Sequence, residues 1–218
     1  MKKGRLNLDE AGIVEGISEV IVTTWTAAGI PNAAPIGIIY TIIDEEAGGG
    51  KDFVNVKLYK SSQTVLNVLK TRTLAANVTN DVLLFVKSAF EHLNGAHFSV
   101  FDGLPVLLDA DAWIVFTAVP VEETRNYFCF QLQPRTVRVR VRAEQKGAPR
   151  AINRGRNAVI EATIFATRYD IIAVDEREKE EIRKIIGYYA AIVKKCGGRR
   201  ENEAIGILQE SFRVRRKN

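Results

Sequence analysis

The sequence is poor in the side chains that bind metal ions or form covalent cross-links. Its 218 residues include two cysteines, Cys129 and Cys196, and two histidines, His92 and His97. Two distant cysteines without a CxxC spacing exclude a disulfide framework and a cysteine zinc site. The two histidines lack paired acids at ligand spacing, and they argue against a distributed Ser-His-Asp triad. We therefore expect no bound metal, and the sequence shows no recognisable arrangement of acid–base or nucleophilic residues.

Long apolar segments are missing as well. No run approaches the roughly 18 apolar residues that a membrane span needs. The first ten residues contain two lysines but lack the apolar stretch of a secretory signal. A composition of 46% hydrophobic and 26% charged residues is that of a globular chain, which excludes disorder and fibrous coiled coils. The sequence thus predicts a cytoplasmic protein without membrane contact.

Positive charge is concentrated in the second half of the chain. Residues 1–120 carry 9 Lys and Arg against 13 Asp and Glu, whereas residues 121–218 carry 22 against 13. Such a basic half is compatible with nucleic acid or with a ligand that carries phosphate. The run Arg138, Arg140 and Arg142 alternates with valines, and no aromatic residue in this segment is available to stack bases. A solvated strand face is therefore favoured, and nucleic acid is the less favoured partner.

The hydrophobic pattern predicts strands first and helices afterwards. The order lacks alternating β and α elements, which argues against a Rossmann sheet. In the last helix, Ala204, Ile207 and Leu208 are expected to face inward. Residues 80–111 give a mixed signal, and residues 45–51 form a glycine-rich turn without nucleotide-loop spacing. We expect strands near 17–25, 36–43, 52–59, 74–79, 113–119 and 136–144, and helices near 62–72, 151–167, 176–196 and 203–212.

These elements predict an α+β, mainly β, protein. Residues 1–148 would form the β domain and residues 149–218 a helical extension.

The segment GIPNAAPIG, residues 29–37, is the first candidate for ligand binding. Its two prolines stiffen the backbone and remove two donors. Between them, Asn32 offers an amide, while Ala33 and Ala34 have minimal side chains. A planar ligand could lie close to such a backbone. Taken alone, a rigid turn that leads into a strand explains the segment better.

Two further polar segments follow predicted strands. In YKSSQT, Ser61 and Ser62 suit the N-cap of a helix, whose free N–H groups bind phosphate, and Lys60 adds a positive charge. In NVTND, residues 77–81, polar side chains could contact the edge of a ligand or form a turn. A capped helix and an ordinary turn are the commoner explanations of the two segments considered singly.

Together, the segments SEVIVTTW, GIPNAAPIG, LYKSSQTVLNV and AANVTND resemble an uncharacterised, largely archaeal family of FMN-binding split-barrel flavoproteins. The wider superfamily includes flavin reductases and relatives of pyridoxamine-phosphate oxidase. NRGRNAVIEATIFATR, residues 153–168, resembles the helical C-terminal part of the same family. The resemblance implies a split β-barrel with a C-terminal helical subdomain, and a homodimer with FMN near the subunit interface.

The resemblance also implies roles for the candidate residues. The isoalloxazine ring would face Asn32, Ala33, Ala34, Pro35, Ile36 and Gly37. The phosphate would be held by Lys60, Ser61, Ser62 and Thr64, and the polar pocket would be completed by Asn77 and Thr79. Glycine is common in the family at the position of Ser62, and a serine there keeps the cap but crowds the backbone near the phosphate.

The implied function is that of an oxidoreductase, because bound FMN itself carries out hydride or electron transfer. The sequence names no catalytic residue, no redox partner and no electron donor. A deazaflavin in place of FMN is a close variant. The alternatives are a non-catalytic FMN carrier or sensor, and a basic nucleic-acid-binding protein.

Overall fold

The computed structural model describes residues 8–43, 51–140, 148–172 and 175–215. The chain forms two compact units. The first comprises Ser18–Ile152 and the segment that ends at Val14, and the second comprises Glu15–Ile17 and the segment that begins at Asn153. The boundary lies four residues after the predicted one at 148.

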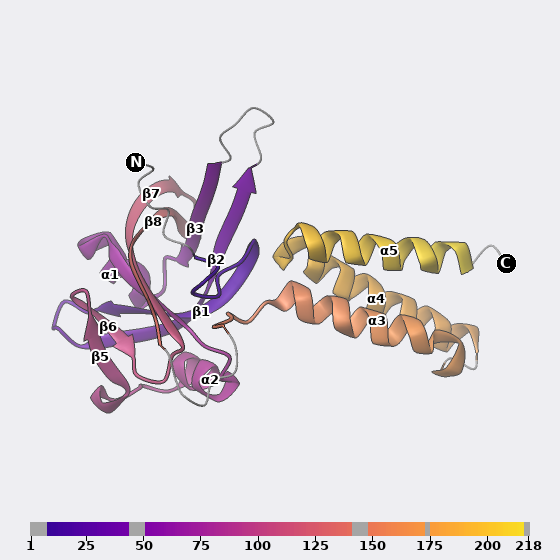
Figure 1. The fold of residues 1–218 in the computed structure, drawn as a ribbon, viewed down its shortest axis with the longest axis horizontal. Helices are drawn as coiled ribbons and strands as arrows, with labels where there is room; N and C mark the ends of the chain where they lie inside the picture. Colours follow the sequence, from indigo (N-terminus) through magenta and orange to yellow (C-terminus); the bar gives the residue numbers. More distant parts are fainter. Residues whose placement is uncertain (1–7, 44–50, 141–147, 173–174, 216–218) are drawn as a thin grey trace. The chain divides into compact units, whose positions relative to one another are not determined.

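The first unit is built around a closed six-stranded barrel (Figure 1). Antiparallel ladders join β2 to β3, β3 to β8, β8 to β7, β7 to β4 and β4 to β1, and β1 neighbours β2. The strands in chain order are β1 (Gly16–Trp25), β2 (Pro31–Ile43), β3 (Lys51–Tyr59), β4 (Thr73–Val78), β7 (Ala112–Glu123) and β8 (Tyr127–Val139). The predicted fold class, a split barrel followed by helices, is confirmed.

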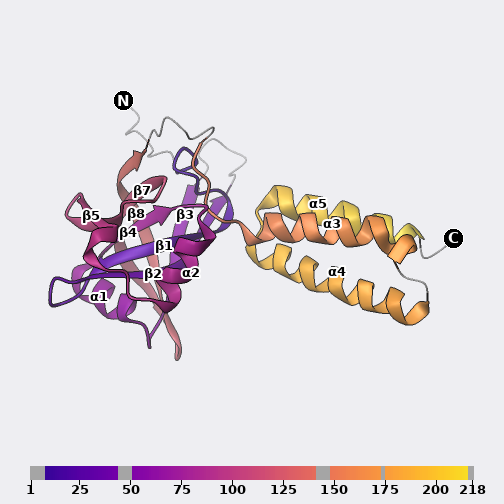
Figure 2. The ribbon, with the colours of Figure 1, turned by 90° about the horizontal axis from the view of Figure 1, so that it is seen from below.

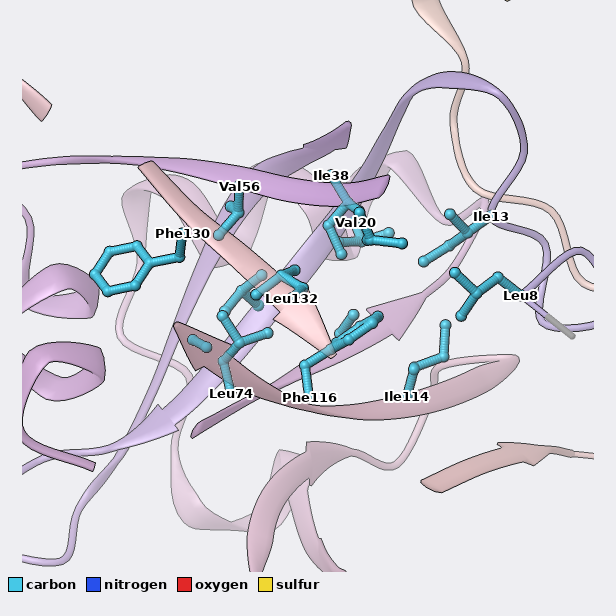
Figure 3. Packing of buried hydrophobic residues seen from close by; sticks show 14 of the residues in the cluster. Leu8, Ile13, Val20, Ile38, Val56, Leu74, Ile114, Phe116, Phe130 and Leu132 are labelled. Atoms are coloured by element: carbon cyan, nitrogen blue, oxygen red, sulfur yellow. The ribbon is translucent and has the colours of Figure 1, made fainter. Parts of the chain in front are cut away.

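The barrel interior is filled by alternate side chains of these strands, as period-two patterning requires. Val20 and Val22 of β1 point inward, and Ile21 between them points outward. The helix α1 (Gln63–Thr71) adds Val65 and Val68 to the same cluster. Figure 3 shows how side chains from distant strands converge, among them Val20, Ile38, Val56, Leu74, Phe116, Phe130 and Leu132.

Residues 80–111, for which the sequence predicts no element, form a second layer on the outer face of the barrel. It contains α2 (Val82–Phe90), the short 3₁₀ helix η1 (Gly95–His97), and a hairpin of β5 (Phe98–Phe101) and β6 (Leu104–Leu107). Asp102 and Gly103, both with positive φ, form the two-residue turn of this hairpin. The layer packs on outward-facing side chains of the barrel such as Ile21, Ala75 and Val115.

The second unit consists of three helices that lie side by side (Figure 2). They are α3 (Arg154–Ile172), α4 (Glu176–Cys196) and α5 (Arg199–Arg215). The bounds of α4 are those predicted, with Asp175 as its N-cap and lysines in its last turn. The predicted inward position of Ile207 is wrong: Ile207 is 64% exposed, and Ile205 is buried instead. Ile205 and Leu208, one turn apart, define the inward side of α5.

Residues Glu15–Ile17 pack against the helices at very short backbone distances. A Cβ placed on Gly16, whose φ is +100°, would lie 2.6 Å from the carbonyl oxygen of Cys196. Glu15 Oε1 accepts a hydrogen bond from Nε of Arg199 at 3.2 Å. The start of β1 is therefore part of the helical unit.

Three sequence predictions fall outside the described residues. They are residues 45–50 of the glycine-rich turn predicted at 45–51, and the positions of Val141 and Arg142. Among the helices of the described segments, none is long and apolar enough to cross a membrane.

Candidate functional site

The first turn of α1 has free hydrogen-bond donors. Ser62 is the N-cap, as predicted: its Oγ accepts from the backbone N of Val65 at 3.3 Å and donates to the carbonyl oxygen of Tyr59 at 2.8 Å. The N–H groups of Gln63 and Thr64 precede the intrahelical bonds, and within the described segments no hydrogen bond engages them. The first turn contains no acidic residue. This helix end therefore presents two open donors and the positive end of the helix dipole.

A partly buried polar network joins this helix to β1 and β2. Asn32 Nδ2 donates to Thr64 Oγ1 at 3.1 Å and lies 3.5 Å from Thr24 Oγ1. Asn67 Nδ2 donates to the same Thr24 oxygen at 2.9 Å, and Gln63 Nε2 donates to Asn67 Oδ1 at 2.8 Å. The network brings two of the predicted segments together, because Asn32 belongs to the first and Thr64 to the second.

Thr24, Gln63 and Asn67 were missed by the sequence analysis. Asn67 is buried and lies one turn after Gln63, so a polar residue on the apolar side of the predicted helix was the available signal. Thr24 gave no such signal, because its partners are 8 and 43 residues away in the chain.

The predicted β2 residues do not share one face of the strand. Ile36 packs with the barrel interior, and Asn32 is directed to the same side by its bond to Thr64. Ala33 instead packs against the outer hydrophobic cluster, as Phe85 of α2 also does. Since successive side chains of a strand alternate, Ala33, Pro35 and Gly37 form one set, and Asn32, Ala34 and Ile36 form the other. A planar ligand against β2 meets one set and the backbone, not all six side chains.

Lys60, directly after β3, places a positive charge close in the chain to the start of α1. Its Nζ lies 2.6 Å from Oε1 of Glu123 and 4.9 Å from the centre of the Phe128 ring. Both charged side chains are partly exposed, at 34% and 59%. Such exposed pairs contribute about 0.2–1 kcal/mol, so a dianion can replace this carboxylate.

Asn77 and Thr79 have other contacts. Asn77 is fully buried, and its Nδ2 donates to the carbonyl oxygen of Ile21 at 2.8 Å and to Thr23 Oγ1 at 2.9 Å. Its Oδ1 accepts from the backbone N of Leu107 at 2.6 Å. Thr79 Oγ1 accepts from the backbone N of Asp81. Their role in a ligand pocket stays a prediction, and Asn77 has no amide hydrogen left for it.

The residues around the start of α1 fit a phosphate group. Open N–H groups, the hydroxyls of Ser61 and Thr64, and the Lys60 ammonium are the donors that a phosphate dianion prefers, whereas the predicted hydroxyl of Ser62 already donates to the Tyr59 carbonyl oxygen. The small side chains of β2 fit a flat ring system, because they let it approach the backbone. The donor set thus has the chemistry that suits a phosphate group attached to a flat ring system.

Two family models match most of the chain. One, described as "Protein of unknown function (DUF447) N-terminal domain", matches residues 18–141. The other, described as "Protein of unknown function (DUF447)", matches residues 153–210. The chain belongs to the DUF447 family. The resemblance inferred from the sequence segments is thereby confirmed at the level of the family.

A solved structure from this family is similar along nearly the whole chain. It is the FMN-bound DUF447 protein of Methanosarcina mazei, with 37% sequence identity, coverage of 94% of this chain and 99% of that chain, and a TM-score of 0.56. A lower similarity, with a TM-score of 0.46, is found to the styrene monooxygenase flavin reductase of Pseudomonas putida S12. That protein is 13% identical, and 57% of this chain and 82% of that chain are covered. Nitrilotriacetate monooxygenase component B of Bacillus cereus is 15% identical, with a TM-score of 0.45. The similarity covers 68% of this chain and 84% of that chain.

Two arginines at the end of β8 in this DUF447 protein, the exposed Arg138 and the half-buried Arg140 just after the strand, also contact aromatic rings, which the sequence did not predict. The guanidinium of Arg138 lies 4.4 Å from the centre of the Phe101 ring, and that of Arg140 lies 5.6 Å from the Trp113 ring. The segment from Thr136 to Arg140 contains no aromatic residue, but the fold supplies Phe101 from β5 and Trp113 from β7. These arginines pack on apolar rings, which explains part of the positive charge without a nucleic acid.

Proposed function

We propose that this DUF447 protein binds FMN and uses it for hydride or electron transfer. The observation that carries the proposal is the open N-terminus of α1, with Lys60 three residues before it in the chain and the Asn32–Thr64 hydrogen bond in its first turn. Support comes from the Methanosarcina mazei relative, which is described as FMN-bound and is 37% identical.

Each residue of the site has a definite part in this proposal. The N–H groups of Gln63 and Thr64 and the Lys60 ammonium hold the phosphate by charge-assisted hydrogen bonds. Asn32 donates to the Thr64 oxygen, so the Thr64 hydroxyl hydrogen is directed away from Asn32 and is free to donate. When bound, FMN supplies a ring that accepts and releases hydride or single electrons. The chain supplies binding and orientation.

We also propose that the protein is a homodimer, as the family resemblance implies. The identity of the electron donor and acceptor is open. Turnover with NADH or NADPH distinguishes an oxidoreductase from a flavin carrier, which would bind FMN and show no steady turnover.

The test is a binding titration with two ligands that differ only in the phosphate. Flavin fluorescence is followed while the apoprotein is added to FMN or to riboflavin. We expect FMN to bind more tightly, and Lys60→Gln to weaken FMN binding about tenfold, because a hydrogen bond to a charged group contributes about 1.5 kcal/mol. Riboflavin binding should be unchanged in this variant.

Lys57→Gln is the matched control. Lys57 is an exposed lysine on β3, and its ammonium lies over the Tyr127 ring at 5.1 Å, not beside α1. The proposal is wrong if the protein retains no FMN, or if FMN and riboflavin bind equally well and both lysine variants behave alike.

A further inference from the structure

The helix α2 carries a row of apolar side chains that face away from the protein. Leu84 and Ser88 are buried beneath the helix. On the opposite side, Val82 is 68% exposed, Leu83 61%, Val86 52% and Phe90 86%. These four residues, the α2 stripe, occupy positions i, i+1, i+4 and i+8 and therefore lie along one side of the helix. Figure 1 shows α2 at the periphery of the first unit.

The α2 stripe is large for a surface that stays in water. From the exposed fractions and ordinary side-chain sizes, it presents roughly 400–500 Å² of apolar area. A stable protein–protein interface buries about 800 Å² on each partner. The stripe alone thus supplies about half of one side of such an interface, and it contains no charged residue that would resist burial.

The shape and chemistry of the stripe favour a second copy of this chain as the partner. Phe90 projects at one end of the helix, and the smaller Val82 and Val86 leave space beside it on the same stripe. Around a two-fold axis, each Phe90 meets the smaller side chains of the other α2. The same surface thus supplies both the projecting ring and the space that receives it, as a self-complementary interface requires. An unrelated partner would have to provide a matching uncharged surface of its own.

The inner side of α2 is continuous with the candidate site. Phe85 of α2 and Leu93 just after it pack in the same cluster as Ala33 of β2. Asn32, the preceding residue of that strand, makes the hydrogen bond to Thr64 at the proposed phosphate site. A partner that covers α2 therefore stands one helix away from the strand that begins the site.

We infer that the α2 stripe is an isologous interface in which α2 packs antiparallel against α2 of a second copy, with Val86 near the two-fold axis. This inference deepens the proposed homodimer by naming its surface. It is independent of whether the dimer binds flavin.

The experiment compares the oligomeric state of three variants in the full chain. Phe90→Asp and Val86→Asp place a charge in the stripe, and both side chains are more than half exposed, so the folded monomer tolerates them. Val100→Asp is the matched control, because Val100 is a 62% exposed apolar residue on β5. Sedimentation velocity at about 1–100 µM protein gives the mass of each, and circular dichroism checks folding.

A cysteine cross-link tests which surfaces meet. Both native cysteines are buried, so the background reaction is low. Val86→Cys should give a disulfide-linked dimer on mild oxidation, since the two residues face each other across the axis. Val100→Cys should not.

We expect the wild type and Val100→Asp to be dimeric, and Phe90→Asp and Val86→Asp to be monomeric. Self-association of the two stripe variants should be at least a hundredfold weaker than that of the wild type. A monomeric wild type overturns the inference, as do stripe variants that remain dimeric or a Val86→Cys protein that does not cross-link. Flavin binding is measured on the same samples. A dimeric wild type that binds no flavin contradicts the proposed function alone, and a monomeric wild type that binds flavin contradicts the interface alone.

Discussion

Replacing Asn77 by alanine should cost the protein stability and leave flavin binding intact. The side chain of Asn77 is fully buried, and its amide bonds to β1 through the Ile21 carbonyl and the Thr23 hydroxyl. Its oxygen accepts from the backbone N of Leu107 in β6. One amide thus connects β4 to a neighbouring strand and to the hairpin that covers the barrel.

The magnitude follows from the groups left behind. The alanine variant leaves the Leu107 N–H without its partner in a region closed to water, and a buried unsatisfied donor costs about 1–3 kcal/mol. The other two lost bonds together add about 1 kcal/mol, and the small cavity adds about 1 kcal/mol more. We therefore expect the free energy of unfolding to fall by about 3–5 kcal/mol, which lowers Tm by roughly 10 °C.

Urea unfolding of the apoprotein, followed by circular dichroism, measures this change. Asn80→Ala is the control, because Asn80 is an exposed asparagine three residues further along the chain and the substitution is the same. The denaturant midpoint should shift in the Asn77 variant and stay within error in the control, with the slope unchanged in both.

The flavin affinity of the folded Asn77→Ala protein separates a structural role from a ligand role. An affinity within about twofold of the wild type supports the structural role, because twofold is about 0.4 kcal/mol. A stability loss below about 1 kcal/mol, together with a tenfold loss of flavin affinity, would refute the reasoning from the hydrogen bonds.

Three other positions give predictions that need no ligand. Gly16→Ala should destabilise the protein by about 2 kcal/mol or more in urea unfolding, because its φ is positive and the new Cβ would meet the Cys196 carbonyl. Gly187→Ala on α4 should stabilise it by about 0.5–1 kcal/mol, since nothing lies within 4 Å of the added methyl; equal effects at the two glycines would contradict the packing. Burial raises the pKa of the Cys129 thiol, and the Glu122 carboxylate acts in the same direction. Iodoacetamide should therefore alkylate Cys129 more slowly than a free cysteine at pH 8, and faster as the pH rises towards that raised pKa; mass spectrometry that finds the rate of a free thiol would contradict this.

The sequence predicted well those elements whose signal is local. The helix α4 has an N-cap, a regular apolar stripe, terminal lysines and a glycine stop, and its bounds were found without error. The cap of α1 was likewise visible as a serine before an apolar period. In both cases, neighbours in the chain provide the determining contacts.

The elements that were missed depend on contacts between distant residues. The α2 sequence is apolar almost all round, because one side meets the barrel and the other is the exposed stripe, so no clear period marks it as a helix. The position of Ile207 was misjudged because Ile205 and Ile207 define competing inward sides of one helix, and only the neighbouring helices select between them.

The candidate site was predicted only as separate pieces. The phosphate-binding features of Ser62 and Lys60 are local, and the sequence showed them. The bond between Asn32 and Thr64 spans 32 residues, and the partners of Asn77 lie 56, 54 and 30 residues away. Asn32 and Asn77 were therefore equally good candidates from the sequence, but their contacts differ. Asn32 lies beside the proposed phosphate site and Asn77 joins three strands, and only the fold determines which is which.

Because Glu15–Ile17 belong to the helical unit, the two units cannot be separated by cutting the chain at one place. The chain passes between the two units after Val14, after Ile17 and after Ile152. A single cut after Ile152 therefore leaves Gly16 without the backbone of Cys196, and the released helices lack the carboxylate that binds Arg199. The helices are not an appendage that a gene could gain or lose in one step, because the first residues of the first barrel strand are already a part of them.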